Sequence, residues 1–137
     1  MSGQTGLRAW FDDYLTAFNR ADFAGFGAFY HDDVIFAGQA AQVTGRGAIL
    51  EFYRTVRTYL HEKVEILTFL GAPDESRIIA ELKTSLVAVQ DWPEMPTGAM
   101  EKGGVRESVN FAIYDISDRR FTRIRTANFS RSSGARR

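Results

Sequence analysis

The hydrophobic residues of this chain change their spacing part-way along the sequence. From Leu7 to Phe18 they recur at intervals of three and four residues, which is the spacing of one helical face. The segment 49–60 repeats that spacing, and a shorter helical stretch runs from the capping residue Asp22 to Tyr30. The first half of the chain is therefore predicted to be mainly helical.

Beyond residue 63 the pattern alternates. Ile78, Ala80 and Leu82 alternate with Glu81 and Lys83, so this strand is predicted to have an apolar face and a charged outer face. Strands are predicted at 34–37, 64–70, 78–87, 105–116 and 121–129, with a turn at 31–33 and loops at 38–47, 71–76 and 90–104. Helices followed by strands in this order predict an α+β fold.

Composition limits the possible partners and sites. With 137 residues, 45% of them hydrophobic, the chain is expected to form a single domain over 1–130, followed by a disordered basic tail at 131–137. Seventeen basic and seventeen acidic residues leave no net charge, which disfavours nucleic acid and membrane partners. The absence of cysteine, of a signal-like start and of a long apolar run favours a cytoplasmic location. His31 and His61 lack metal-ligand spacing, so no metal site is expected.

Three segments of the sequence, at 14–22, 29–34 and 45–54, carry a resemblance to a known family. In their order and spacing they resemble the NTF2-like superfamily, especially its SnoaL-like and ketosteroid-isomerase branches. The resemblance implies an α+β cone, in which a curved mixed sheet wraps around the N-terminal helix and encloses an apolar pocket. It also implies a homodimer, a small apolar ligand and no cofactor.

The same resemblance assigns roles to three tyrosines. Tyr14 matches the family's oxyanion-hole tyrosine, and Tyr30 and Tyr53 match two tyrosines that support it in some isomerases, which implies a chain of three hydrogen-bonded phenols. The family's catalytic carboxylates are missing, because their positions fall at 37–39 and near Val109. A standard ketosteroid isomerase is therefore not expected. From the residues alone, the pattern favours an ordinary core tyrosine on an apolar stripe.

Residues of the predicted strands at 105–116 and 121–129 supply further candidates. If Val109 and Phe111 face the pocket, Glu107 shares their face and would act as an acid or base at the rim; alternatively, it is a solvated charge paired with an arginine. Asn128 would orient a ligand oxygen. The predicted ligand-contacting residues are Trp10, Phe18, Phe36, Phe52, Leu82, Thr84, Val109, Phe111 and Asn128.

Two functions fit this sequence. One is a cofactor-free isomerase, lyase or dehydratase that acts on a bulky apolar molecule of steroid, terpenoid, polyketide or aromatic type, with Tyr14 as the oxyanion donor. The other is a ligand-binding or dimeric scaffold protein, which the missing carboxylates favour, since a fold does not fix a function. In both cases the outer sheet face, with Ile79, Val87, Glu81, Lys83, Arg123 and Arg125, is expected to form the homodimer interface.

Overall fold

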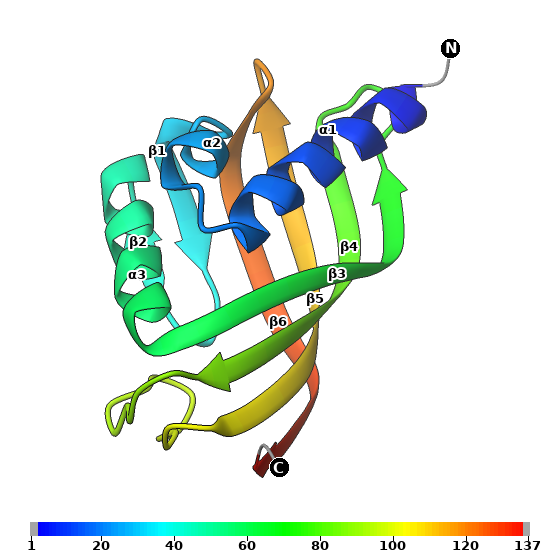
Figure 1. The fold of residues 1–137 in the computed structure, drawn as a ribbon. Coiled ribbons are helices and arrows are strands. Elements are labelled where there is room, and N and C mark those ends of the chain that lie inside the picture. The colour runs from blue at the N-terminus through cyan, green and yellow to red at the C-terminus, as the bar shows by residue number, and fades with distance from the viewer. Residues whose placement is uncertain (1–2, 136–137) are drawn as a thin grey trace.

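The computed structural model describes residues 3–135 and the side chains of residues 6–132. Its elements follow the order helix, helix, two strands, helix and four strands (Figure 1). They are α1 (Gly3–Asn19), α2 (Phe23–Gly27), β1 (Tyr30–Ala37), β2 (Gln42–Thr44), α3 (Arg46–Tyr59), β3 (Leu60–Gly71), β4 (Arg77–Ala88), β5 (Gly104–Ser117) and β6 (Arg120–Ala135).

The strands form one curved mixed sheet in the order β2-β1-β6-β5-β4-β3. Every neighbouring pair is antiparallel except β1 and β6, which run parallel. In Figure 1 the sheet curls around α1, while α3 lies beside β1 and β2. This arrangement confirms the predicted α+β cone with an N-terminal helix inside a curved sheet.

Helix α1 is held by its apolar stripe and by one polar clamp. Leu7, Phe11 and Phe18 are buried against the sheet and the other helices. At the end of the helix, the Asn19 side chain donates to the Val64 carbonyl at 3.0 Å and accepts from the Val64 amide at 2.8 Å. These two bonds tie the last turn of α1 to the middle of β3.

Helix α3 passes directly into β3, without a loop between residues 60 and 64. Leu60 has extended dihedral angles, φ −127° and ψ 143°, and pairs with Ala88 of β4. The sequence pattern placed the strand start at Val64, and that boundary is wrong because pairing with β4 outweighs the helical spacing. The next inward-pointing residue after Leu60 is consequently Glu62.

Other boundaries also shift because strands pair beyond the predicted limits. Tyr30 begins β1, where a helix end and turn were expected, because it pairs with Phe121. Residues 42–44 form the short edge strand β2 within the expected loop. Strand β6 continues to Ala135 alongside β5, into the segment where a basic tail was expected, and residues 136 and 137 lie outside the described residues.

Gly45 makes the turn from β2 into α3. Its φ of 99° lies in the left-handed region, which residues with a side chain adopt at a cost, so glycine is required at this corner. The turn directs α3 across the open side of the cone.

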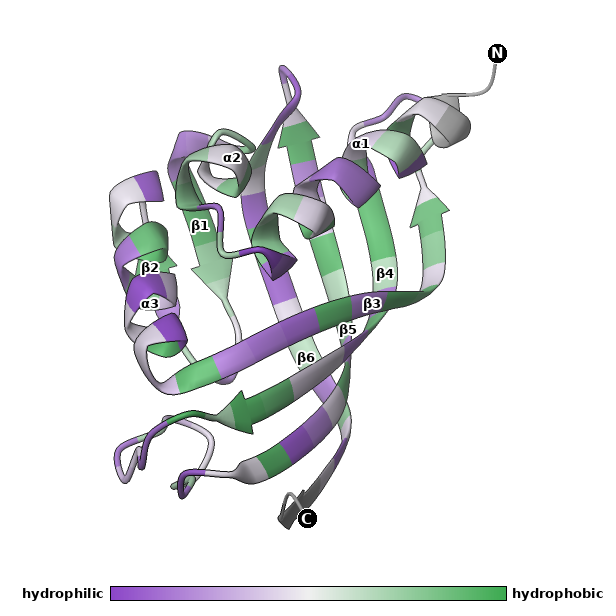
Figure 2. Cartoon of the chain, viewed as in Figure 1, coloured by the Kyte–Doolittle hydropathy of each residue, from purple (hydrophilic) through white to green (hydrophobic). Residues whose placement is uncertain are grey.

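Hydrophobic residues form bands on β1, β4 and β5 in Figure 2. The same view shows a hydrophilic stretch along β3. None of the helices in the described part of the chain is long and apolar enough to cross a membrane.

Candidate active site

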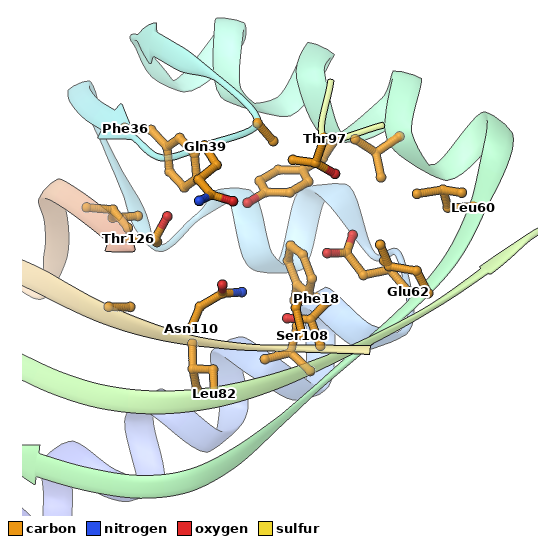
Figure 3. Close-up of a pocket in the computed structure, with 18 of the residues that line it drawn as sticks. Phe18, Phe36, Gln39, Leu60, Glu62, Leu82, Thr97, Ser108, Asn110 and Thr126 are labelled. Atoms are coloured by element: carbon orange, nitrogen blue, oxygen red, sulfur yellow. The ribbon is translucent and has the colours of Figure 1, made fainter. Parts of the chain in front are cut away.

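A cavity of about 180 Å³ lies between the concave face of the sheet and the helices α1 and α3 (Figure 3). The larger part of its wall is apolar. Its apolar lining residues include Leu15, Phe18, Phe36, Phe52, Val56, Leu60, Leu82, Leu86 and Ile124. A cavity of this size and character accommodates a small apolar molecule, so the polar groups exposed to it determine its chemistry.

Two phenols form a hydrogen-bonded pair at one side of the cavity. The hydroxyl oxygens of Tyr14 and Tyr30 are 2.7 Å apart, and only Tyr14 lines the cavity. Burial raises the pKa of Tyr14 well above its usual value and also raises the pKa of Tyr30. Both phenols therefore stay neutral at pH 7. When Tyr30 donates to Tyr14, the Tyr14 proton is available to a ligand oxygen.

Tyr53 lines the same cavity but does not extend this pair into the expected chain of three. Its ring packs edge-on against Phe18 at 4.9 Å between ring centroids. Among the described residues its hydroxyl makes no hydrogen bond, in contrast to the chain that the resemblance implied. Tyr53 is therefore a second phenol that faces the cavity, separate from the Tyr14–Tyr30 pair.

Glu62 brings a carboxylate into the cavity from β3. Its side chain is 12% exposed, and its Oε1 atom is buried and accepts no hydrogen bond within the part of the chain that the structure describes. Figure 3 shows the carboxylate directed into the space between β3 and Asn110. Burial raises the pKa of Glu62 to about 7, and the Arg57 guanidinium opposes part of that rise. A carboxylate with a pKa near neutrality has the strength of a general base.

Asn110 forms part of the opposite wall and is held by Asn128. Asn110 lines the cavity and sits across from Asn128, whose Nδ2 donates to Asn110 Oδ1 at 2.9 Å. Because this bond occupies the Asn110 oxygen, the Asn110 NH₂ group is left to face the cavity. Asn128 itself does not line the cavity, so it positions Asn110 and does not contact the ligand as expected.

The predicted residues of β5 lie on the wrong face of the sheet. Phe111 is 44% exposed, and Glu107 forms an ion pair with Lys83 at 3.5 Å on the outer face. The expectation that Glu107, Val109 and Phe111 face the pocket is therefore wrong. The register with β4 explains this placement, because the inward-facing Leu82 and Thr84 pair with Asn110 and Ser108.

Of the remaining residues predicted to contact a ligand, all but Trp10 line the cavity. Phe18, Phe36, Phe52, Leu82 and Thr84 all line the cavity. Trp10 is half-buried outside it and packs against Phe29 and Phe121, with ring centroids 5.2 and 5.0 Å away.

Sequence reasoning missed Glu62, Ser108, Asn110 and Arg106 as cavity residues. The sequence held one signal for Glu62. It stands two residues after Leu60 and two before Val64, so in a strand it faces the same side as these two apolar residues. In the described part of the chain, no three histidine or acidic side chains gather in a way that could hold a metal ion.

A family model of the SnoaL-like domain matches residues 7–124, which is most of the sequence. The chain belongs to the SnoaL-like family. This finding confirms the resemblance to the SnoaL-like branch of the NTF2-like superfamily.

Solved structures with the SnoaL-like fold carry several different descriptions. A protein from Xanthomonas campestris pv. campestris, proposed to be a polyketide cyclase, is 22% identical, with a TM-score of 0.77 and 92% of each chain covered. An LEH-like epoxide hydrolase from M. tuberculosis is 14% identical, with a TM-score of 0.72 and coverage of 92% of this chain and 84% of that one. A computationally designed 17-OHP binder is 14% identical, with a TM-score of 0.73 and coverage of 98% and 100%. A search of curated proteins gave no match. At these identities the likenesses show the fold alone.

Proposed function

We propose that the protein is a cofactor-free isomerase, lyase or dehydratase whose general base is Glu62 and whose hydrogen-bond donor is Tyr14. The observation that carries this proposal is the Glu62 carboxylate, buried in a largely apolar cavity with an oxygen that accepts no hydrogen bond from the described residues. A purely structural carboxylate gains little from such a position, whereas a base gains proton affinity.

The two groups have complementary roles in one reaction. Glu62 removes a proton from a carbon next to a carbonyl group, and Tyr14 donates a hydrogen bond to the carbonyl oxygen, on which negative charge develops as the enolate forms. Glu62, once protonated, returns the proton to another carbon in an isomerisation, or to a leaving hydroxyl group in a dehydration. The apolar wall favours a small hydrophobic substrate and excludes competing water.

The proposal can be tested without knowing the natural substrate. 2-Tetralone is a small bicyclic ketone, and exchange of its α-protons in D₂O, followed by NMR, requires both a base and a donor to the enolate oxygen. The wild-type protein is expected to accelerate this exchange above the buffer rate. Glu62→Gln is expected to lower the acceleration about a hundredfold or more.

Glu65→Gln is the matched control, because Glu65 is an exposed residue of the same strand. It removes one carboxylate from β3 without changing the cavity. Equal exchange rates in the wild type and Glu62→Gln would contradict the proposed base.

A second candidate function is ligand binding without catalysis. The designed 17-OHP binder favours it, because the same fold serves there as a binder. In that case the wild type and Glu62→Gln bind 2-tetralone equally, and neither accelerates the exchange.

A further inference from the structure

Tyr53 presents its phenol to the cavity from a fixed position. Its ring is surrounded by other aromatic rings, at 4.9 to 6.3 Å between centroids, which belong to Phe18, Phe52, Phe26 and Phe36. Close packing on several sides leaves the side chain little freedom to change its rotamer. The Tyr53 hydroxyl group is therefore held in one place on the cavity wall.

The hydroxyl group of Tyr53 is not used by the fold. Within the part of the chain that the structure describes, it makes no hydrogen bond, whereas the hydroxyl groups of Tyr14 and Tyr30 are bonded to each other. Burial raises the pKa of Tyr53 well above its usual value, so this phenol keeps its proton at pH 7. A neutral phenol in this position can donate its proton to an oxygen of a ligand.

Arg57 links the position of Tyr53 to that of Glu62. Tyr53 and Arg57 are four residues apart on α3, so they lie one turn apart on the same side of the helix. Arg57 Nε lies 3.7 Å from Glu62 Oε1, and both Glu62 and Tyr53 line the cavity. The charge of Glu62 is also one cause of the raised pKa of Tyr53. One ligand can therefore contact this carboxylate and this phenol together.

The cavity thus holds one more proton-carrying group than an isomerisation uses. A base at Glu62 and a donor to the enolate oxygen at Tyr14 are sufficient to move a proton from one carbon to another. Loss of a hydroxyl group needs an acid at the departing oxygen as well, because hydroxide is a poor leaving group. A phenol with its own proton, separate from the Tyr14–Tyr30 pair, meets that need.

We propose that the substrate is a β-hydroxy ketone and that Tyr53 donates the proton with which its hydroxyl group leaves as water. This inference rests on the proposed function, because Glu62 first removes the proton between the two oxygen-bearing carbons and Tyr14 stabilises the enolate. The C–O bond then breaks, and the departing oxygen takes the Tyr53 proton. The proton held by Glu62 restores the Tyr53 phenol, and this transfer is favourable because Tyr53 has the higher pKa. The products are an enone and water, and the protein is unchanged.

The test compares two reactions that share proton abstraction but differ in the leaving group. 4-Hydroxy-4-phenylbutan-2-one is a β-hydroxy ketone, and its dehydration to benzalacetone can be followed by ultraviolet absorbance. The wild type is expected to accelerate this dehydration above the buffer rate. Tyr53→Phe is expected to lower the acceleration about a hundredfold, while α-proton exchange of 2-tetralone, which has no hydroxyl group to lose, stays within about twofold of the wild-type rate.

Tyr59→Phe is the matched control, because Tyr59 belongs to the same helix but stacks on Trp92 and does not line the cavity. It is expected to leave both rates unchanged. Tyr53→Phe removes no hydrogen bond between described residues, so its urea midpoint is expected to equal that of the wild type. Equal losses of dehydration and exchange in Tyr53→Phe, or dehydration that this variant leaves unchanged, overturn the proposal.

The same two reactions separate this inference from the proposed function. Acceleration of tetralone exchange without any acceleration of dehydration refutes only the β-hydroxy ketone and the acid at Tyr53. Dehydration that depends on Tyr53 but continues at the wild-type rate in Glu62→Gln refutes only the proposed base.

Discussion

Arg57 Nε lies 3.7 Å from Glu62 Oε1, which is too far for a hydrogen bond, because the same guanidinium is anchored elsewhere. Its Nη2 donates to the Phe18 carbonyl at 2.6 Å, and its plane lies over the Phe18 ring at 5.3 Å from the centroid. Arg57 therefore stabilises the Glu62 anion through its charge while leaving the carboxylate oxygen unbound. This combination leaves the carboxylate able to ionise and one of its oxygens available to a ligand.

The first prediction concerns the pH dependence of activity. Proton abstraction requires the ionised form of Glu62, so kcat/KM for tetralone exchange is expected to rise with pH through a midpoint of about 7. Arg57→Met removes the neighbouring positive charge and is expected to move the midpoint upward by about one pH unit. Arg54→Met, at an exposed arginine of the same helix, is expected to leave it in place. An unshifted midpoint in Arg57→Met would contradict the proposed coupling.

A second prediction concerns stability. The pKa of Glu62 is higher in the folded protein, about 7, than its ordinary value of 4.5. The folded state therefore retains a proton that the unfolded state releases, and this contribution to stability is complete below pH 4.5 and lost as the pH rises through 7. Urea unfolding is expected to show a loss of about 3 kcal/mol from this group between these limits. In Glu62→Gln this part of the pH dependence is expected to be absent, and an unchanged profile would show that Glu62 ionises normally.

A third prediction concerns the phenol pair. Tyr14→Phe leaves the buried Tyr30 hydroxyl without its partner, so unfolding should become easier by about 1 to 3 kcal/mol. Because each single variant breaks the same bond, the double variant with Tyr30→Phe should cost less than the sum of both. Tetralone exchange is expected to fall about a hundredfold in Tyr14→Phe and less in Tyr30→Phe. Tyr59→Phe is the control, because that ring stacks on Trp92, and equal activity in Tyr14→Phe and Tyr59→Phe would remove Tyr14 from the mechanism.

A fourth prediction concerns association. The outer face of the sheet exposes Ile79, Phe111 and Phe129, and the rings of Phe111 and Phe129 are 5.2 Å apart. We expect this face to join two copies of the chain, so sedimentation should show a dimer that Phe111→Glu weakens. Val89→Glu, at an equally exposed residue outside the sheet, should leave the dimer intact. A wild-type protein that sediments only as a monomer would contradict this expectation.

The hydrophobic pattern was sufficient to predict the fold class, because the helical stripe of α1 and the alternation of β4 are ordinary. The expectation that Tyr14 faces the pocket came from the family resemblance, because the stripe alone indicates a core tyrosine. The sequence did not predict which face of β5 lines the cavity, because here the polar residues face inward and the apolar residues face outward. There Ser108 and Asn110 face inward while Val109 and Phe111 face outward. The alternation rule assumes an apolar interior, and it fails where the interior is a polar cavity wall.

Glu62 was missed for a different reason. Its segment continues directly from α3, and local spacing cannot reveal that β4 pairs with it and draws it into the sheet. Element boundaries depend on such distant pairing and are the least predictable part of a fold.

The alternation of inward- and outward-facing residues along β4 also affects how this protein can evolve by substitution. Leu82, Thr84 and Leu86 line the cavity, whereas Ile79, Glu81 and Lys83 lie on the other face. A mutation at one of the inner positions alters the shape offered to a ligand and leaves the outer surface untouched, and the reverse holds for the outer positions. Substitutions in this one strand can therefore alter the cavity and the outer surface, on which we expect the dimer to form, independently of each other.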